Sequence, residues 1–252
     1  MVGSGRGVYE TMGGETGARI VLLLGLEISV LYIAGSYAMG RLMAISGFGG
    51  GMAPGRIAFF LLVFPGVVLH EGSHYLACLL TGTKVSRFAA FSPRRSADGR
   101  LVLGYVRHER RAFPIGTVIG LAPILLNPLG ILLFTALLTP LTLSEVVDPS
   151  LETFENGLAG GFLTQTPLLA AVWAYLSLSL ALGSVPSRED LSGMPAVLLL
   201  LGGSVFLLGL FRAGSDSGFS SALLDVAALA AGLYALPAAV ALVAALIARI
   251  LR

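Results

Sequence analysis

Charged residues and cysteine are both scarce in this sequence. Asp, Glu, Lys and Arg make up 12% of the 252 residues, and hydrophobic residues make up 56%. A soluble domain carries about 25% charged residues, so we predict an all-α integral membrane protein. Cys78 is the only cysteine, which excludes an internal disulfide and any CxxC metal or redox motif.

Six apolar runs have the length of about 20 residues that a helix needs to cross a bilayer. Residues 1–17 are Gly-rich and polar, and we predict that they form a flexible N-terminal tail, which leaves 18–252 as a single polytopic membrane domain. The predicted spans are 18–40, 56–80, 113–139, 166–185, 194–212 and 222–251.

Lys and Arg are distributed unevenly along these spans. If six spans alternate in direction, thirteen of the 16 basic residues lie on the side that holds both termini and the loops 81–112 and 186–193. Loop 140–165, on the other side, has no basic residue. The positive-inside rule therefore predicts that both termini are cytoplasmic. The expected location is a prokaryotic cell membrane.

Loop 81–112 has a regular pattern. The stretches KVSRFAAFSP and RLVLGYVRHE flank SADG, and both alternate in part between polar residues and β-branched or aromatic ones. This pattern predicts a short cytoplasmic β-hairpin that turns near Asp98 and Gly99. The many basic residues of the loop equally fit contact with anionic lipid headgroups, and the sequence leaves both interpretations open.

The second predicted span contains HEGSH, formed by His70, Glu71 and His74. Residues four apart lie on one face of a helix, so both imidazoles can bind the same ion. Zinc held in this way lowers the pKa of a bound water to about 7, and the adjacent glutamate can take its proton as a general base. The alternative is a hydrogen-bonded pair of polar residues, but ionisable groups inside spans are rare and usually functional.

A catalytic zinc ion usually has three protein ligands and one water. We predict Asp190 as the third ligand, because SVPSREDLSG follows the fourth span on the same side of the membrane as the two histidines. Pro186 and Gly193 give that segment the irregular backbone that polar sites in membranes use. Glu189 is a neighbouring alternative, His108 is a weaker one, and Asp190 could instead cap a helix.

Three further polar residues lie in apolar runs. Asn127 precedes Pro128 deep in the third span, where its amide could stabilise a substrate or a transition-state oxyanion or hold helices together. Glu27 in the first span could line a water path, and Asp225 near the start of the sixth is expected at a membrane interface.

The order of these motifs carries a resemblance. The chain has HEGSH in one span, then a hairpin-like segment, then GLAPILLN in the next span and PSREDLSG after another. This order resembles the site-2 protease family of intramembrane zinc metalloproteases, in its compact members without a PDZ domain. The resemblance covers 56–193 and implies a three-helix core, with His70, His74 and Asp190 as zinc ligands, Glu71 as the base and Asn127 as the polar residue of the middle helix. The chain departs from the family pattern at Gly183, where Asn is usual, and at Leu191, where Gly is usual.

The expected function is therefore that of a metalloendopeptidase that binds one Zn²⁺ and hydrolyses transmembrane or membrane-proximal proteins, with no nucleic-acid partner. Two imidazoles and a carboxylate also suit other divalent ions. One alternative is a metal-binding membrane scaffold with the same fold and no proteolysis. A less favoured alternative is a small transporter, which would need more ionisable residues deep in several spans.

Overall fold

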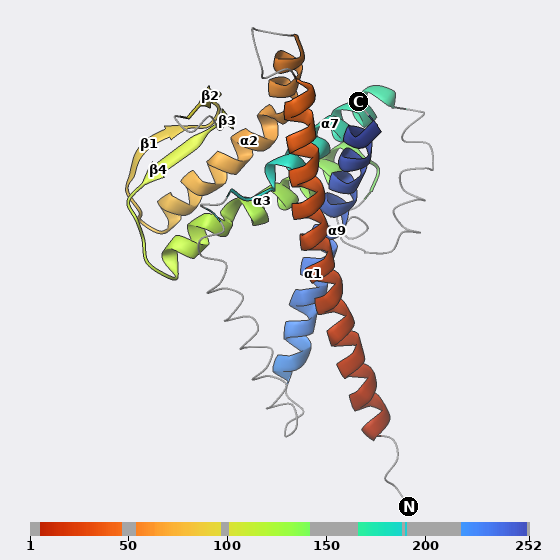
Figure 1. Ribbon diagram of the computed structural model, residues 1–252. Helices are drawn as coiled ribbons and strands as arrows, with labels where there is room; N and C mark the ends of the chain where they lie inside the picture. Colours follow the sequence, from red (N-terminus) through yellow and green to blue (C-terminus); the bar gives the residue numbers. More distant parts are fainter. Residues whose placement is uncertain are drawn as a thin grey trace, which may run out of the picture.

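The computed structural model describes residues 6–46, 54–96, 101–141, 166–187, 190 and 218–250. Side chains are described for 22–46, 55–96, 101–141, 166–187, 190 and 232–250. The elements are α1 (Arg6–Ile45), α2 (Pro54–Leu80), β1 (Val85–Ala89), β2 (Arg94–Arg95), β3 (Leu101–Val102), β4 (Tyr105–His108), α3 (Ile115–Leu138), α7 (Pro167–Gly183) and α9 (Gly218–Ile250) (Figure 1).

Four of these helices are long and apolar enough to cross a membrane. They are Leu22–Ile45, Gly55–Leu80, Ile115–Leu138 and Gly232–Ile250, which match the first, second, third and sixth predicted spans. The fourth predicted span corresponds to α7, a shorter apolar helix of 17 residues. The fifth, 194–212, lies outside the described residues.

Helix α1 begins earlier than the sequence predicted. It starts at Arg6, so residues 6–17 of the predicted N-terminal tail have a helical backbone. Once an apolar span has nucleated a helix, each added residue gains a hydrogen bond at little cost. The Gly-rich composition alone did not show this extension.

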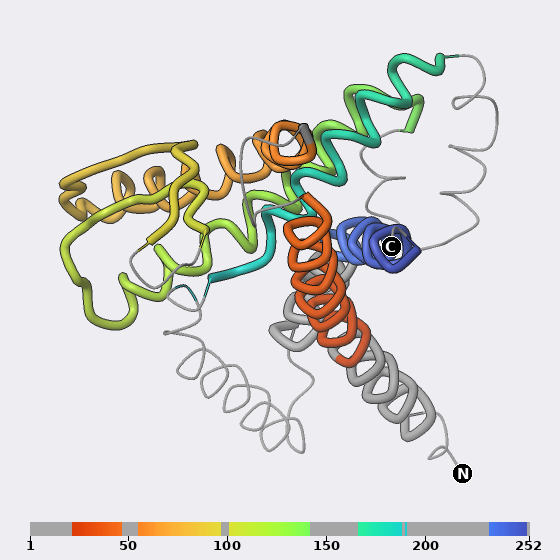
Figure 2. The backbone as a smooth tube through the Cα atoms, turned by 45° about the horizontal axis from the view of Figure 1, so that its top comes forward, coloured from red at the N-terminus to blue at the C-terminus, as the bar shows by residue number. Residues whose placement is uncertain are grey.

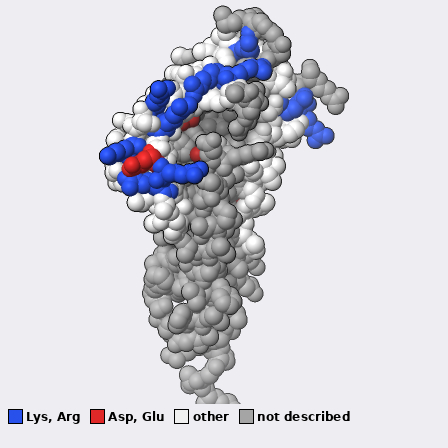
Figure 3. Space-filling model, turned by 60° about the vertical axis from the view of Figure 1, so that its left-hand side comes forward, with Lys and Arg blue, Asp and Glu red and all other residues white. Residues whose placement is uncertain are grey.

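The predicted hairpin is present. β1 pairs with β4 in antiparallel register, with Phe88 opposite Val106, and β2 pairs with β3, with Arg95 opposite Leu101. The predicted turn at Asp98 and Gly99 lies outside the described residues. Lys and Arg side chains gather on this side of the molecule (Figure 3).

The hairpin folds back along α2. The ring of Phe88 stacks on Tyr75 with centroids 4.8 Å apart, and the ring of Phe91 meets Phe64 edge-on at 5.0 Å. Tyr75 and Phe64 lie about three turns apart on α2. The hairpin is therefore fixed along a long stretch of this helix by aromatic contacts, which prefer such offset and edge-on geometries.

Helices α1 and α9 lie side by side (Figure 1). Small residues at this contact let the two backbones approach closely, as is usual between helices in membranes. The buried alanines described in these two helices are Ala34, Ala38, Ala238, Ala241, Ala244 and Ala248.

Helices α2, α3 and α7 contact one another in pairs, and α3 runs along α7 (Figure 2). The closest crossing joins α2 and α7 through two glycines. A Cβ atom at Gly183 would lie 2.5 Å from the Gly66 carbonyl oxygen, and a Cβ at Gly66 would collide with the backbone of Ser179. Side chains larger than hydrogen at either position would separate the helices.

Prolines inside these helices supply further contacts. Proline has no N–H, so the carbonyl four residues before it loses its helical partner. Pro65 in this way frees the Leu61 carbonyl, which accepts a hydrogen bond from the Tyr175 hydroxyl at 2.7 Å. Pro128 frees the Ile124 carbonyl, which accepts from the Tyr234 hydroxyl at 2.9 Å. In an apolar interior such groups must find a partner within the protein.

Candidate metal centre

The two histidines of HEGSH point toward one spot. His70 and His74 lie one turn apart on α2, and their Nε2 atoms are 3.3 Å apart with the rings at 80° to each other. A helix holds residues four apart on one face, so this half of the site follows from the local sequence. His74 is buried and His70 is partly buried.

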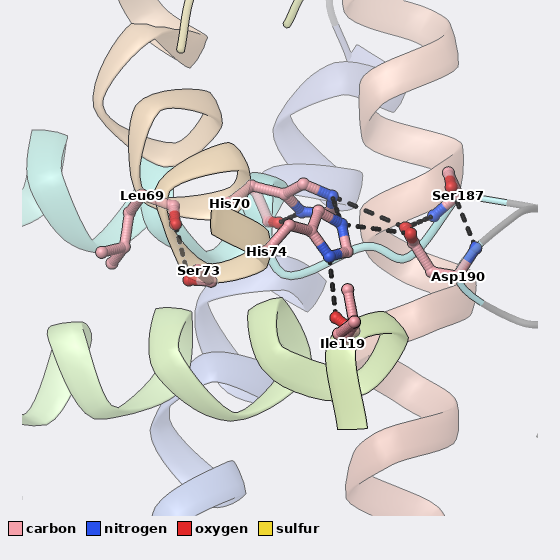
Figure 4. A network of polar contacts seen from close by, with 8 residues as sticks. Leu69, His70, Ser73, His74, Ile119, Ser187 and Asp190 are labelled. Atoms are coloured by element: carbon pink, nitrogen blue, oxygen red, sulfur yellow. Dashed lines mark hydrogen bonds and ion pairs between the residues drawn. The ribbon is translucent and has the colours of Figure 1, made fainter. Parts of the chain in front are cut away.

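Asp190 faces both imidazoles (Figure 4). Its Oδ2 atom lies 3.5 Å from His70 Nε2, and its Oδ1 atom lies 3.1 Å from His74 Nε2. The structure therefore brings together the three residues that the sequence singled out as ligands. Their ligand atoms lie within 4.8 Å of one another, so the group could hold a metal ion.

Each imidazole is oriented by a hydrogen bond on its far side. His70 Nδ1 lies 2.7 Å from the Gly183 carbonyl oxygen, and His74 Nδ1 lies 2.8 Å from the Ile119 carbonyl oxygen. Carbonyl oxygens only accept hydrogen bonds, so we infer that Nδ1 carries the proton in both rings. In a neutral imidazole the Nε2 atom then has a free lone pair, which is the arrangement typical of metal-binding histidines.

These tautomers leave three electron-pair donors facing one another. Two bare Nε2 atoms and a carboxylate at this separation need a positive charge between them, supplied by protons or by a metal cation. Atoms bound tetrahedrally to zinc at about 2.0–2.1 Å stand about 3.3 Å apart. The separation of 3.3 Å between the two Nε2 atoms fits that spacing, and each Nε2 atom has one oxygen of Asp190 at 3.1 or 3.5 Å.

A short turn holds the aspartate. The Ser187 N–H donates to Asp190 Oδ2 at 2.6 Å, and the Asp190 N–H donates to Ser187 Oγ at 3.2 Å. This is the reciprocal pattern of a capping box, with Ser187 at the cap position; the residues that would form a helix after Asp190 lie outside the described ones. Gly120 of α3 gives the turn room, because a Cβ there would lie 2.9 Å from the Asp190 carbonyl oxygen.

Asp190 is ionised in this setting. Burial raises the pKa of its carboxyl group, but the His70 and His74 side chains beside it, when protonated, outweigh that effect and hold the pKa well below its usual range. A carboxylate is the form that binds a cation.

Glu71 lies beside the three ligands. It follows His70 on α2, and its carboxyl group is close enough to His70, His74 and Asp190 to interact electrostatically with all three. The hairpin covers its side chain, because a Cβ atom at Gly104 would lie 2.6 Å from Glu71 Cγ. Glu71 is not one of the three residues whose ligand atoms form the group.

Other residues weighed from the sequence lie elsewhere. His108 ends β4, where its Nδ1 donates to the Glu109 carbonyl at 2.7 Å, outside the ligand group. Asn127 is fully buried in α3, and neither amide atom has a hydrogen-bond partner among the described residues. Glu27 is buried in α1 with its Oε2 atom similarly unpartnered within the described part. Glu189 and the side chain of Asp225 lie outside the described residues.

Sequence reasoning missed several groups that support the ligands. Ser187 had a readable signal, because S-x-x-D is a capping-box pattern. Gly104 and Gly120 had none, since their role depends on which backbone passes beside them. The carbonyls of Ile119 and Gly183 belong to the main chain and therefore carry no signal in their side chains. Comparison with known proteins finds no matching family model, curated protein or solved structure.

Proposed function

We propose that this protein is an intramembrane zinc metalloprotease that hydrolyses peptide bonds of membrane-embedded or membrane-proximal proteins. The observation that carries the proposal is the separation of the three ligand atoms. The two imidazole Nε2 atoms stand 3.3 Å apart, close to the ligand spacing of a tetrahedral zinc site, and each lies 3.1–3.5 Å from a different oxygen of the Asp190 carboxylate. Glu71 is close enough to interact electrostatically with all three residues. Three ligands with one open position are typical of catalytic zinc sites.

The residues divide the chemistry among them. His70, His74 and Asp190 would hold the ion, which supplies Lewis-acid activation of a carbonyl and of a water. Glu71 would take the proton of that water as general base and deliver it to the leaving amine as general acid. The Gly183 and Ile119 carbonyls keep both imidazoles oriented for this arrangement.

The proposal includes a membrane topology. We propose six spans in the membrane of a prokaryotic cell, with both termini in the cytoplasm and the metal centre toward the cytoplasmic side. The distribution of basic residues along the sequence supports this orientation. A substrate helix would have to unwind there, because its intact hydrogen bonds shield the scissile carbonyl. Asn127, fully buried in α3, would meet such a substrate only after the surrounding helices move apart.

Metal analysis of the purified chain tests the centre. Wild type should contain about one zinc per chain, and a His70→Ala, His74→Ala double variant should contain none. His108→Ala is the matched control, because it removes the histidine outside the ligand group and should keep the metal. A wild type without bound metal would contradict the proposed centre.

Proteolysis is tested separately. Glu71→Gln should keep the zinc and abolish cleavage of co-expressed membrane proteins, whereas Glu109→Gln in the hairpin should leave both unchanged. The two substitutions remove the same charge, and only one lies beside the ligands. If wild type and Glu71→Gln give the same cleavage pattern while both bind zinc, the chain is a metal-binding scaffold.

A further inference from the structure

Pro123 of α3 lies four residues after Ile119, whose carbonyl orients His74. Since proline has no N–H, the Ile119 carbonyl has no partner in its own helix, and the proline ring pushes it outward. His74 Nδ1 lies 2.8 Å from that oxygen. We propose that Pro123 is a positioning residue of the metal centre: it frees the carbonyl that fixes the tautomer and orientation of His74. This inference rests on the metal centre of the proposed function.

Burial makes the contact obligatory. Pro123 and Ile119 are both buried, with Ile119 exposed by 2%, so water does not reach the freed carbonyl. A buried carbonyl without a partner costs about 1–3 kcal/mol. The imidazole N–H satisfies it, and the same bond directs the Nε2 lone pair toward His70 and Asp190.

His70 obtains the same kind of partner by a different route. Its Nδ1 donates to the carbonyl of Gly183, the last residue of α7. The last four carbonyls of any helix lack helical partners, so no proline is needed there. The acceptor of His74, the Ile119 carbonyl, lies in the second turn of α3 and not at the end of a helix, and there the proline four residues later leaves it free.

Helix α3 also contains the control. Pro128 frees the Ile124 carbonyl by the same mechanism, but that oxygen accepts from Tyr234 of α9 and has no contact with the ligands. The two prolines lie five residues apart in one helix and are both buried. Replacing either proline restores one backbone N–H, so the two variants differ mainly in which side chain loses its carbonyl acceptor, His74 or Tyr234.

The test compares zinc affinity of the full-length chain in detergent, measured by competition with a chelator. Pro123→Ala should weaken zinc binding by about 10–100-fold, the usual effect of losing a residue that orients a ligand. Pro128→Ala should change it by less than about threefold. Equal affinities of wild type and Pro123→Ala, or equal losses in both variants, would overturn the proposal.

Nuclear magnetic resonance of the zinc-loaded wild type gives a second measurement, independent of whether Pro123→Ala folds. With ¹⁵N-labelled histidine, the resonances of His74 should show a proton on Nδ1 and none on Nε2. A proton on Nε2 of His74 would overturn the inference together with the role of that atom as a ligand, whereas equal zinc affinities of wild type and Pro123→Ala would overturn the inference alone. Absence of zinc from wild type would instead contradict the proposed function itself.

Discussion

The backbone of Gly104 lies directly against the side chain of Glu71. A Cβ atom at position 104 would stand 2.6 Å from Glu71 Cγ and 2.8 Å from the Ala90 carbonyl oxygen. Gly104 lies between β3 and β4, so the hairpin limits the space that Glu71 can occupy. In the proposed enzyme this contact would keep the carboxyl group beside the ligands.

Replacing Gly104 with alanine should therefore impair catalysis more than metal binding. The added methyl group must displace either Glu71 or the hairpin backbone, and we expect cleavage to fall at least about tenfold, since small misplacements of a catalytic group are costly. Zinc content should stay near one per chain, because Gly104 does not touch the ligands. Cleavage assays and metal analysis of the same preparation measure both effects.

Gly72→Ala is the matched control for that variant. Gly72 is adjacent to Glu71 on α2, and a Cβ there would meet no atom within 4 Å. Alanine in a helix is favoured over glycine by up to about 1 kcal/mol. This variant should keep its activity and unfold at the same or a higher temperature. Equal loss of activity in both variants would contradict a specific role for the hairpin contact.

The turn that carries Asp190 predicts an effect of Ser187. In Ser187→Ala the Asp190 N–H loses its acceptor at 3.2 Å, although the backbone N–H of residue 187 still donates to the carboxylate. We expect zinc affinity to fall by about tenfold, in the lower range for residues that orient a ligand. Chelator competition measures this change. Ser86→Ala, which removes an exposed hydroxyl bonded to the Arg107 carbonyl, should have no effect on zinc.

The glycine crossing of α2 and α7 predicts a large loss of stability in Gly66→Ala. Its methyl group would collide with the backbone at Ser179, next to the hydroxyl that accepts the Gly66 N–H at 2.9 Å. Overpacking of this kind costs about 1–3 kcal/mol or more, and it would also move Gly183 away from His70. Thermal unfolding in detergent should show the loss, whereas Gly25→Ala, with open space around its Cβ, should be neutral or stabilising.

Tyr175 and Tyr234 both donate hydrogen bonds to carbonyls that a proline leaves free, and they should contribute unequally to the free energy of unfolding. Tyr234 is buried, and Tyr234→Phe would leave the Ile124 carbonyl unpaired, at a cost of about 1–3 kcal/mol in the free energy of unfolding. Tyr175 is 37% exposed, so loss of its bond to Leu61 should cost less, about 0.5–1 kcal/mol. Reversible denaturation of the two variants side by side checks this order. A larger loss in Tyr175→Phe would be contrary to the expectation from burial.

Features that depend on near neighbours along the chain could be predicted from the sequence. Apolar runs of sufficient length indicated membrane helices. The i, i+4 spacing of His70 and His74 placed both imidazoles on one face of α2, and alternation around SADG predicted the hairpin. The shared face of the two histidines and the hairpin both follow from the residue period of a helix or a strand. They can therefore be predicted without knowledge of contacts between distant parts of the chain.

Completion of the site depends on how distant parts of the chain fold together. Asp190 lies 116 positions after His74 in the sequence, and its approach to the imidazoles depends on the Ser187 turn and on the room left by Gly120. The acceptors for both Nδ1 atoms are main-chain carbonyls, which every residue has and which become selective only where a helix ends or a proline interrupts it. The folded positions of α3, α7 and the hairpin, and not the motif, therefore orient the ligands and cover Glu71.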